Sequence, residues 1–250
     1  MTTEGLKLPY LPTATKVGNF EFKGWYTEPT GGALISTTTE FTSDITVYAH
    51  YVFTGEGSGI DSRLFVEGAQ IRLPADDGSV SQGIRFRSMM KIDLYNLLDA
   101  NERPDSADDT GIGFGTVVFP TKILGDATLK KDTVVSYGGR DFAAKVVPAV
   151  VLYNKTSSTV YFNAVMTDVA ESNYDTEYTV VPYITYNDPE LGEVTLYGTA
   201  YSTSIFKVAR AAYNDSSSTD YVKEYMLNNI LSKVDPDTYE KDEWTDIFRP

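Results

Sequence analysis

Short runs in which apolar and polar residues alternate recur along most of this chain, and they constrain its fold more than any other feature. A period of two places successive side chains on opposite faces of a β-strand. In the segment GIRFRSM, one face carries Ile84, Phe86 and Ser88, and the other carries Arg85, Arg87 and Met89. This pattern predicts a strand with one buried face.

Segments of this kind are separated by turns rich in Gly, Pro and Asn. The predicted strands are 64–73, 83–89, 113–120, 133–137, 144–153, 159–166, 178–187 and 194–208. Many strands at regular spacing with few helices are typical of a β-sandwich. We therefore expect a mainly β fold, with a jelly-roll-like sandwich and one or two peripheral helices.

Two segments have helical spacing instead. A short helix is predicted over 91–101, where apolar residues recur at intervals of three and four. Ser216 to Thr219 supply the N-cap of a second, amphipathic helix that runs to Val234. The acidic segment 235–250 has little periodicity and is predicted to be a tail.

The N-terminal fifth of the chain carries three ordered blocks: FEFKGWY over 20–26, TEPTGG over 27–32 and TVYAHY over 46–51. Together they resemble the Listeria-Bacteroides repeat over residues 5–52, the small repeat of internalin B and of many bacterial surface proteins. The resemblance implies a β-grasp-like unit with a helix-sized crossover, in which Phe22 and Trp25 are core aromatics.

This sequence departs from the repeat pattern in three ways. Tyr51 stands where the family usually has Trp, and Asn19 stands where it often has Gly. In the family, an opening strand and an Asn-Gly-Gly turn precede the position of Gly5, and this sequence has no residues for them. We therefore expect an N-terminally truncated repeat with an open sheet edge.

We expect four parts along the chain: the repeat at 1–54, a Gly-rich linker at 55–61, the β-sandwich at 62–214, and a helix with an acidic tail at 215–250. The order of GAQIR (68–72), GIRFRS (83–88), GFGTVVFP (113–120) and FNAVMTDV (162–169) is similar to uncharacterised β-rich domains of gut-Firmicute surface proteins. That likeness implies no activity.

Charge and composition narrow the location and the partners. The net charge of -14 repels nucleic acid and anionic lipid at long range, so neither is an expected partner. No apolar stretch is long enough to span a membrane, and no membrane insertion is expected. We expect an extracellular location on a Gram-positive cell surface or cell wall, with leader and anchor outside this chain; the alternative is a cytosolic protein.

The sequence offers little for catalysis. It has no cysteine, and His50 is its one histidine, expected as an exposed strand residue. No GxSxG elbow is present, so a Ser-His-Asp hydrolase is not predicted. A glycoside hydrolase would need two carboxylates, for which the pairs are Asp168 with Glu171 and Asp188 with Glu190. We expect no enzymatic activity and no cofactor.

Candidate ligand contacts are few. Tyr178, Tyr183 and Tyr186 are candidates for sugar stacking, and the alternative is that they are half-buried sheet tyrosines. Arg85 and Arg87 are candidates for binding a carboxylate or uronate, and the alternative is cross-strand pairing with acids. Asp105, Asp108 and Asp109 are candidates for a structural calcium site, against a solvated loop.

The function predicted from these features is that of a non-enzymatic segment of a bacterial cell-surface protein, acting as a spacer, adhesion or binding module. A host or cell-wall glycan, or a surface protein, is the expected partner. The alternative is a carbohydrate-binding module of an extracellular glycanase.

Overall fold

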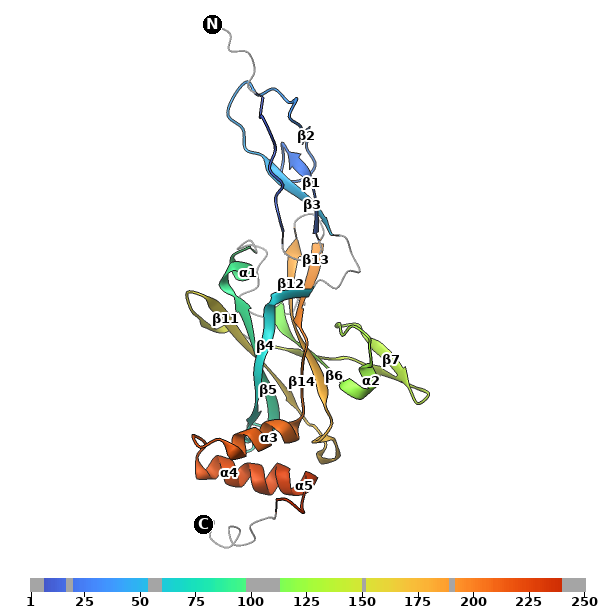
Figure 1. The fold of residues 1–250 in the computed structure, drawn as a ribbon, viewed down its shortest axis with the longest axis vertical. Coiled ribbons are helices and arrows are strands. Elements are labelled where there is room, and N and C mark those ends of the chain that lie inside the picture. Colours follow the sequence, from blue (N-terminus) through green and yellow to red (C-terminus); the bar gives the residue numbers. More distant parts are fainter. Residues whose placement is uncertain are drawn as a thin grey trace.

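A computed structural model describes residues 7–16, 20–53, 60–97, 113–149, 152–188 and 192–239. Figure 1 shows a small sheet at the N-terminal end, a large twisted sheet in the middle and a group of helices at the C-terminal end. The prediction of a mainly β fold with few helices is confirmed.

The small sheet is antiparallel, with the order β2-β1-β3. Its strands are β1 (Phe20–Tyr26), β2 (Leu34–Ile35) and β3 (Tyr48–Phe53). The ring of Phe22 lies 5.7 Å from that of Trp25 and 5.6 Å from that of Tyr51, so the predicted aromatic packing is present. Within 20–53 the structure contains no helix, unlike the crossover that the resemblance implied.

Nine strands form the large sheet, in the order β10-β11-β5-β4-β13-β12-β6-β9, with β14 also paired to β12. Their bounds are β4 (Ile60–Arg72), β5 (Gly83–Lys91), β6 (Gly113–Pro120), β9 (Lys145–Pro148), β10 (Leu152–Lys155), β11 (Thr159–Thr167), β12 (Tyr178–Asp188), β13 (Gly192–Thr199) and β14 (Tyr201–Thr203). All described pairings are antiparallel except that of β4 with β13.

The two layers of the domain are the two halves of this one sheet. Phe114 on β6 and Phe162 on β11 are far apart in strand order, yet their rings lie 5.1 Å apart in one buried cluster. The sheet therefore bends over itself and buries its inner face, and the parallel β4–β13 pair, which we call the seam, lies between the two halves in the strand order. Apolar residues of both halves fill the space between them, as in a sandwich.

Two residues of types that weaken an ordinary strand lie at or beside the seam. Pro182 lies on β12 between the part that pairs with β14 and the part that pairs with β13, where its missing N–H costs no ladder bond. A Cβ on Gly198 would lie 2.1 Å from the carbonyl oxygen of Leu64. Only glycine therefore allows β13 to approach β4 this closely.

Several predicted element bounds differ from the structure. The predicted strand 144–153 is two strands, β9 and β10, on opposite ends of the sheet. Strand β4 begins at Ile60, so its first two residues fall within the segment 55–61 that was predicted as a linker. The predicted helix 91–101 is α1 (Ile92–Leu97), and its last residues lie outside the described part of the chain.

A hairpin projects beside the sheet after a short helix. It consists of β7 (Val134–Tyr137) and β8 (Arg140–Ala143), and it follows α2 (Thr121–Leu124). Gly138 and Gly139 form its tip with φ values of 59° and 77°, which glycine adopts without strain. Figure 1 shows this hairpin extending away from the large sheet.

Helices pack together at the C-terminal end. They are α3 (Ile205–Asn214), α4 (Asp220–Met226), the π-helical turn η2 (Leu227–Leu231) and α5 (Ser232–Val234). The hydroxyl oxygen of Thr219 accepts a hydrogen bond from the Val222 amide, which confirms the predicted N-cap.

The prediction of a strand over 194–208 is wrong at its end. Strand β14 ends at Thr203, and α3 follows because the Ser204 hydroxyl caps it by accepting from the amide of Lys207. Ile205, Val208 and Ala209 are buried at helical spacing against the inner face of the sheet. The same spacing can be read in the sequence, but the strand-forming residues before it led to the prediction of one continuous strand.

Candidate functional site

The outer face of β5 carries Arg85 and Arg87, the two candidates for binding a carboxylate or uronate. Ile84 and Phe86 are fully buried on the inner face, so Arg85 and Arg87 point to the other side. Arg87 lies opposite Gly68 on β4 and Asn163 on β11. The predicted orientation of the GIRFRSM segment is confirmed.

A β-bulge decides which acid meets Arg87. The register shifts between Val66 and Gly68, which leaves Glu67 as the extra residue of β4. The Glu67 Oε2 lies 2.9 Å from the Arg87 Nε, and the Arg87 guanidinium lies 4.5 Å from the ring centroid of Tyr161. Arg87 is therefore held by a carboxylate and an aromatic face together.

Arg85 has a different environment. Its neighbours across the sheet are Gln70 on β4 and Val165 on β11. Within the described residues, no ion pair or hydrogen bond involves its half-buried guanidinium. Arg85 is therefore available to an external acceptor.

The candidate tyrosines lie in the core of the domain. Tyr186 is fully buried, Tyr183 is 4% exposed and Tyr178 is 9% exposed, and each belongs to a different apolar cluster. Burial raises the pKa of Tyr183 to about 12, with the nearby Tyr197 adding to the effect. These rings form no common surface, and their burial matches the alternative of sheet tyrosines.

A cleft of about 210 Å³ lies at the N-terminal end of β5. The sequence analysis did not predict this cleft. Its walls come from the loop before β5, from the segment after β11, from the end of η1 (Glu171–Asn173) and from the start of α3. The lining residues are Ser81, Gln82, Gly83, Asp168, Val169, Tyr174 and Ile205. No local motif joins these residues, so no signal in the sequence identifies the cleft.

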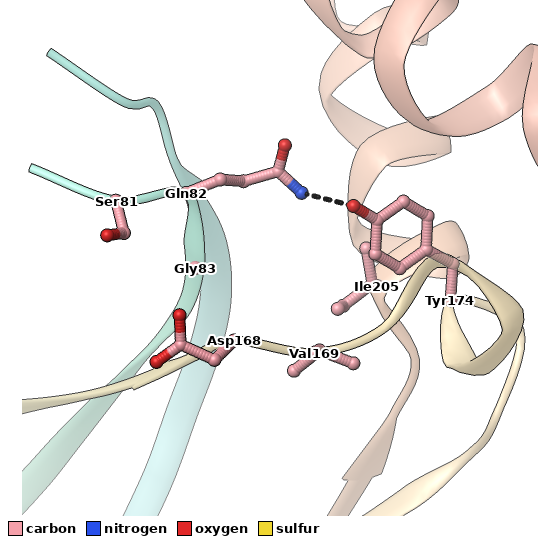
Figure 2. A pocket seen from close by; sticks show the side chains of 7 residues that line it. All are labelled: Ser81, Gln82, Gly83, Asp168, Val169, Tyr174 and Ile205. Atoms are coloured by element: carbon pink, nitrogen blue, oxygen red, sulfur yellow. Dashed lines mark hydrogen bonds between the residues drawn. The ribbon is translucent and has the colours of Figure 1, made fainter. Parts of the chain in front are cut away.

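Figure 2 shows how the polar side chains lie in this cleft. The Gln82 amide spans it and donates a hydrogen bond to the Tyr174 hydroxyl at 2.9 Å, while Asp168 lies on the side of Gly83 and Ser81. The Gln82 oxygen also accepts from the Tyr225 hydroxyl on α4. Burial raises the pKa of Tyr225 to about 12, and Tyr174 and Tyr221 contribute.

The carboxylates considered for hydrolysis do not gather in the cleft. Asp168 lines it, is exposed and accepts a hydrogen bond from the Thr167 hydroxyl at 2.8 Å. Glu171 forms an ion pair with Lys233 and does not line the cleft. The side chain of Asp188, and the whole of Glu190, lie outside what the structure describes.

His50 was predicted to be an exposed strand residue, but it is half-buried and its ring contacts other groups. Its ring stacks on Tyr26 with centroids 4.0 Å apart, and its Nε2 lies 2.9 Å from the carbonyl oxygen of Glu28. These contacts connect β1, β3 and the turn between β1 and β2, so the histidine has a structural use.

Neither a cluster of metal ligands nor a membrane-spanning helix is found among the described residues. Among them, no three His, Cys, Asp or Glu side chains gather as a metal site would require. No helix in the described ranges is long and apolar enough to cross a membrane. The calcium candidates Asp105, Asp108 and Asp109 lie outside those ranges.

Residues 2–50 match the family model of the Listeria-Bacteroides repeat domain. This match supports the resemblance that the FEFKGWY and TVYAHY blocks indicated, and the repeat is one that occurs in surface proteins. No curated protein and no solved structure matches the chain. The likeness of the larger domain to gut-Firmicute surface proteins stays a prediction.

Proposed function

We propose that this chain is a non-catalytic segment of a bacterial cell-surface protein, in which the repeat acts as a spacer and the large β domain acts as a binding module. The observation that carries this proposal is the match of residues 2–50 to a repeat that occurs in surface proteins. The aromatics of that repeat are used for packing, which suits a structural spacer.

The use of the titratable side chains supports a non-catalytic function. His50 is engaged by Tyr26 and by the Glu28 carbonyl, which leaves no free imidazole for base catalysis among the described residues. Asp168 lines the cleft without a second carboxylate in its lining, whereas glycoside hydrolysis requires a pair.

Surface location is tested by labelling intact cells of the source bacterium with an antibody raised against the purified chain. We expect labelling before permeabilisation, while an antibody against a ribosomal protein labels only permeabilised cells. Labelling that appears only after permeabilisation would contradict the proposal. Turnover of a polysaccharide by the purified chain, abolished by a single carboxylate substitution, would contradict its non-catalytic part.

A second candidate is a carbohydrate-binding module of an extracellular glycanase. The outer face of β5 favours it, because Arg85 is a donor with no partner among the described residues and lies beside Gln70. A glycan array with the purified chain separates a sugar-binding module from a domain that binds another kind of partner or only spaces. Binding that is lost on substitution of an outer-face residue supports the module.

A further inference from the structure

Three arginines share the outer face of the β11-β5-β4 layer, and we call this surface the arginine face. Arg72 lies opposite Gly83, so it stands in the same row of side chains as Arg85 and Arg87. The inward neighbours Ile71 and Ile84 pack in the core, which confirms that Arg72 points outward.

The arginine face carries a local excess of positive charge in a chain whose net charge is -14. Arg87 is balanced by Glu67, and the Arg72 Nε donates to the carbonyl oxygen of Ser81 at 3.1 Å. A carbonyl does not neutralise a guanidinium. Arg72 and Arg85 therefore keep uncompensated charges within the part of the chain that the structure describes. Such charges attract an anionic ligand.

Other side chains on the arginine face suit a ligand with hydroxyl groups. The exposed Gln70 lies across from Arg85, and its amide offers both a donor and an acceptor. Tyr161 adds a half-buried aromatic ring to the same surface.

The position of β5 in the sheet argues against an extended peptide as the ligand. Peptides that add to a sheet bind through the unpaired main chain of an edge strand. Both edges of β5 are already paired, with β4 on one side and β11 on the other. A ligand on the arginine face is therefore recognised by side chains alone.

We propose that the arginine face binds an acidic glycan, whose carboxylates pair with Arg85 and Arg72 and whose hydroxyls meet the exposed amide of Gln70. This inference rests on the proposed binding function and adds the class of ligand. The arginine fork matches a carboxylate in a two-point geometry that a lysine does not reproduce.

Calorimetric titration with oligogalacturonate and with hyaluronan fragments tests the proposal. We expect at least one of these uronates to bind, more weakly as salt is raised, and the methyl ester of the same oligosaccharide to bind at least about tenfold more weakly because it has lost the charge. Binding of poly-glutamate as tightly as the uronate would overturn the glycan in favour of an acidic peptide. Failure of both uronates to bind would overturn the proposal itself.

Arg85→Gln is the informative variant, because it breaks no hydrogen bond or ion pair among the described residues. We expect it to weaken uronate binding about tenfold, and Arg85→Lys to restore only part of the affinity. Arg140→Gln on the projecting hairpin is the matched control, since it changes the net charge equally and is expected to leave binding within about twofold. Equal losses in the two Gln variants would overturn the assignment of this face.

Failure of this proposal is distinguishable from failure of the proposed function. Surface labelling of intact cells does not depend on which ligand the arginine face binds. A chain that labels at the surface but binds no uronate refutes the glycan alone. A chain that is absent from the surface refutes the location, whatever the titration gives.

Discussion

The hydroxyl of Tyr225 on α4 donates a hydrogen bond to the side-chain oxygen of Gln82, 2.5 Å away and 143 residues earlier in the sequence. The other end of the Gln82 amide donates to Tyr174. One side chain thus joins the C-terminal helices, the loop before β5 and the segment after β11. Gln82 and Tyr174 also line the cleft, and the bridge adds polar contacts to the apolar packing of the helices against the sheet.

Removing the Tyr225 hydroxyl should destabilise the fold. Tyr225→Phe leaves the Gln82 oxygen without its donor in a part-buried site, and we expect the free energy of unfolding to fall by about 1 kcal/mol. Urea denaturation measures this change. Tyr221→Phe is the control, because Tyr221 is exposed and should change little. Equal effects of the two variants would show that the bridge contributes nothing.

The same tyrosine should contribute to alkaline unfolding. Burial raises the pKa of Tyr225 from 10.0 to about 12, so between these values the unfolded state loses the proton while the folded state keeps it. The stabilising contribution is complete below pH 10 and is lost as the pH rises toward 12. Urea denaturation at pH 9 and pH 11 should show a smaller decline for Tyr225→Phe than for the unsubstituted chain. An identical decline would contradict this assignment.

Gly198 should tolerate no side chain. A Cβ at this position lies 2.1 Å from the Leu64 oxygen and 2.6 Å from the Leu64 carbonyl carbon, and backbone atoms of a paired strand cannot move aside cheaply. We expect Gly198→Ala to cost about 3 kcal/mol or to prevent folding. Gly68→Ala is the matched control on β4, where a Cβ meets nothing within 4 Å. Thermal denaturation of both variants tests the seam, and a mild effect at Gly198 would mean that β4 and β13 are further apart than described.

Asp168 adopts a left-handed conformation with φ of 61°, alone among the non-glycine residues that the structure describes. Asn tolerates this region and a β-branched residue does not. We expect Asp168→Asn to leave the free energy of unfolding within about 0.5 kcal/mol, and Asp168→Val to lower it by about 1–2 kcal/mol. Denaturant unfolding measures both changes. Similar values for the two variants would show that the backbone here relaxes without strain.

Trp25 should hold the N-terminal segment against the small sheet. Its indole Nε1 donates to the carbonyl oxygen of Pro12 at 2.7 Å. Trp25→Phe keeps an aromatic ring beside Phe22 but removes this donor, so trypsin should cleave after Lys16 faster. Mass spectrometry follows the fragments, and cleavage after Lys207 serves as the internal control. Unchanged cleavage after Lys16 would mean that other contacts hold the segment.

Much of the strand content follows from local alternation. The predicted strand 113–120 has the same bounds as β6, and in GIRFRSM the side chains of Ile84 and Phe86 point inward as predicted. Prediction failed where two elements follow each other without a clear break. Strand-forming residues recur from Val194 to Val208, and the change to helix at Ile205 depends on the Ser204 cap and on packing against the sheet.

The candidate site was only partly predictable for a related reason. Alternation placed Arg85 and Arg87 on one face, but the sequence did not indicate that Glu67 would reach Arg87, because that contact depends on a bulge in the neighbouring strand. Tyr183 and Tyr186 lie on opposite faces of β12, and both became core residues. The bend of the sheet covers Tyr186, whereas α2, the segment after it and the β7-β8 hairpin cover Tyr183.

By itself the sequence determined the mainly β class, the repeat at the N-terminus, the capped helix after Thr219 and the outward direction of Arg85. These features depend on period, on local hydrogen bonds and on residue order, which act over a few neighbouring positions. Only the tertiary structure decided that β4 and β13 pair in parallel, that Gln82 meets Tyr225 and that Arg72 joins Arg85 on one face. Those contacts join residues far apart in the chain, and their free energy appears only when distant strands share a core.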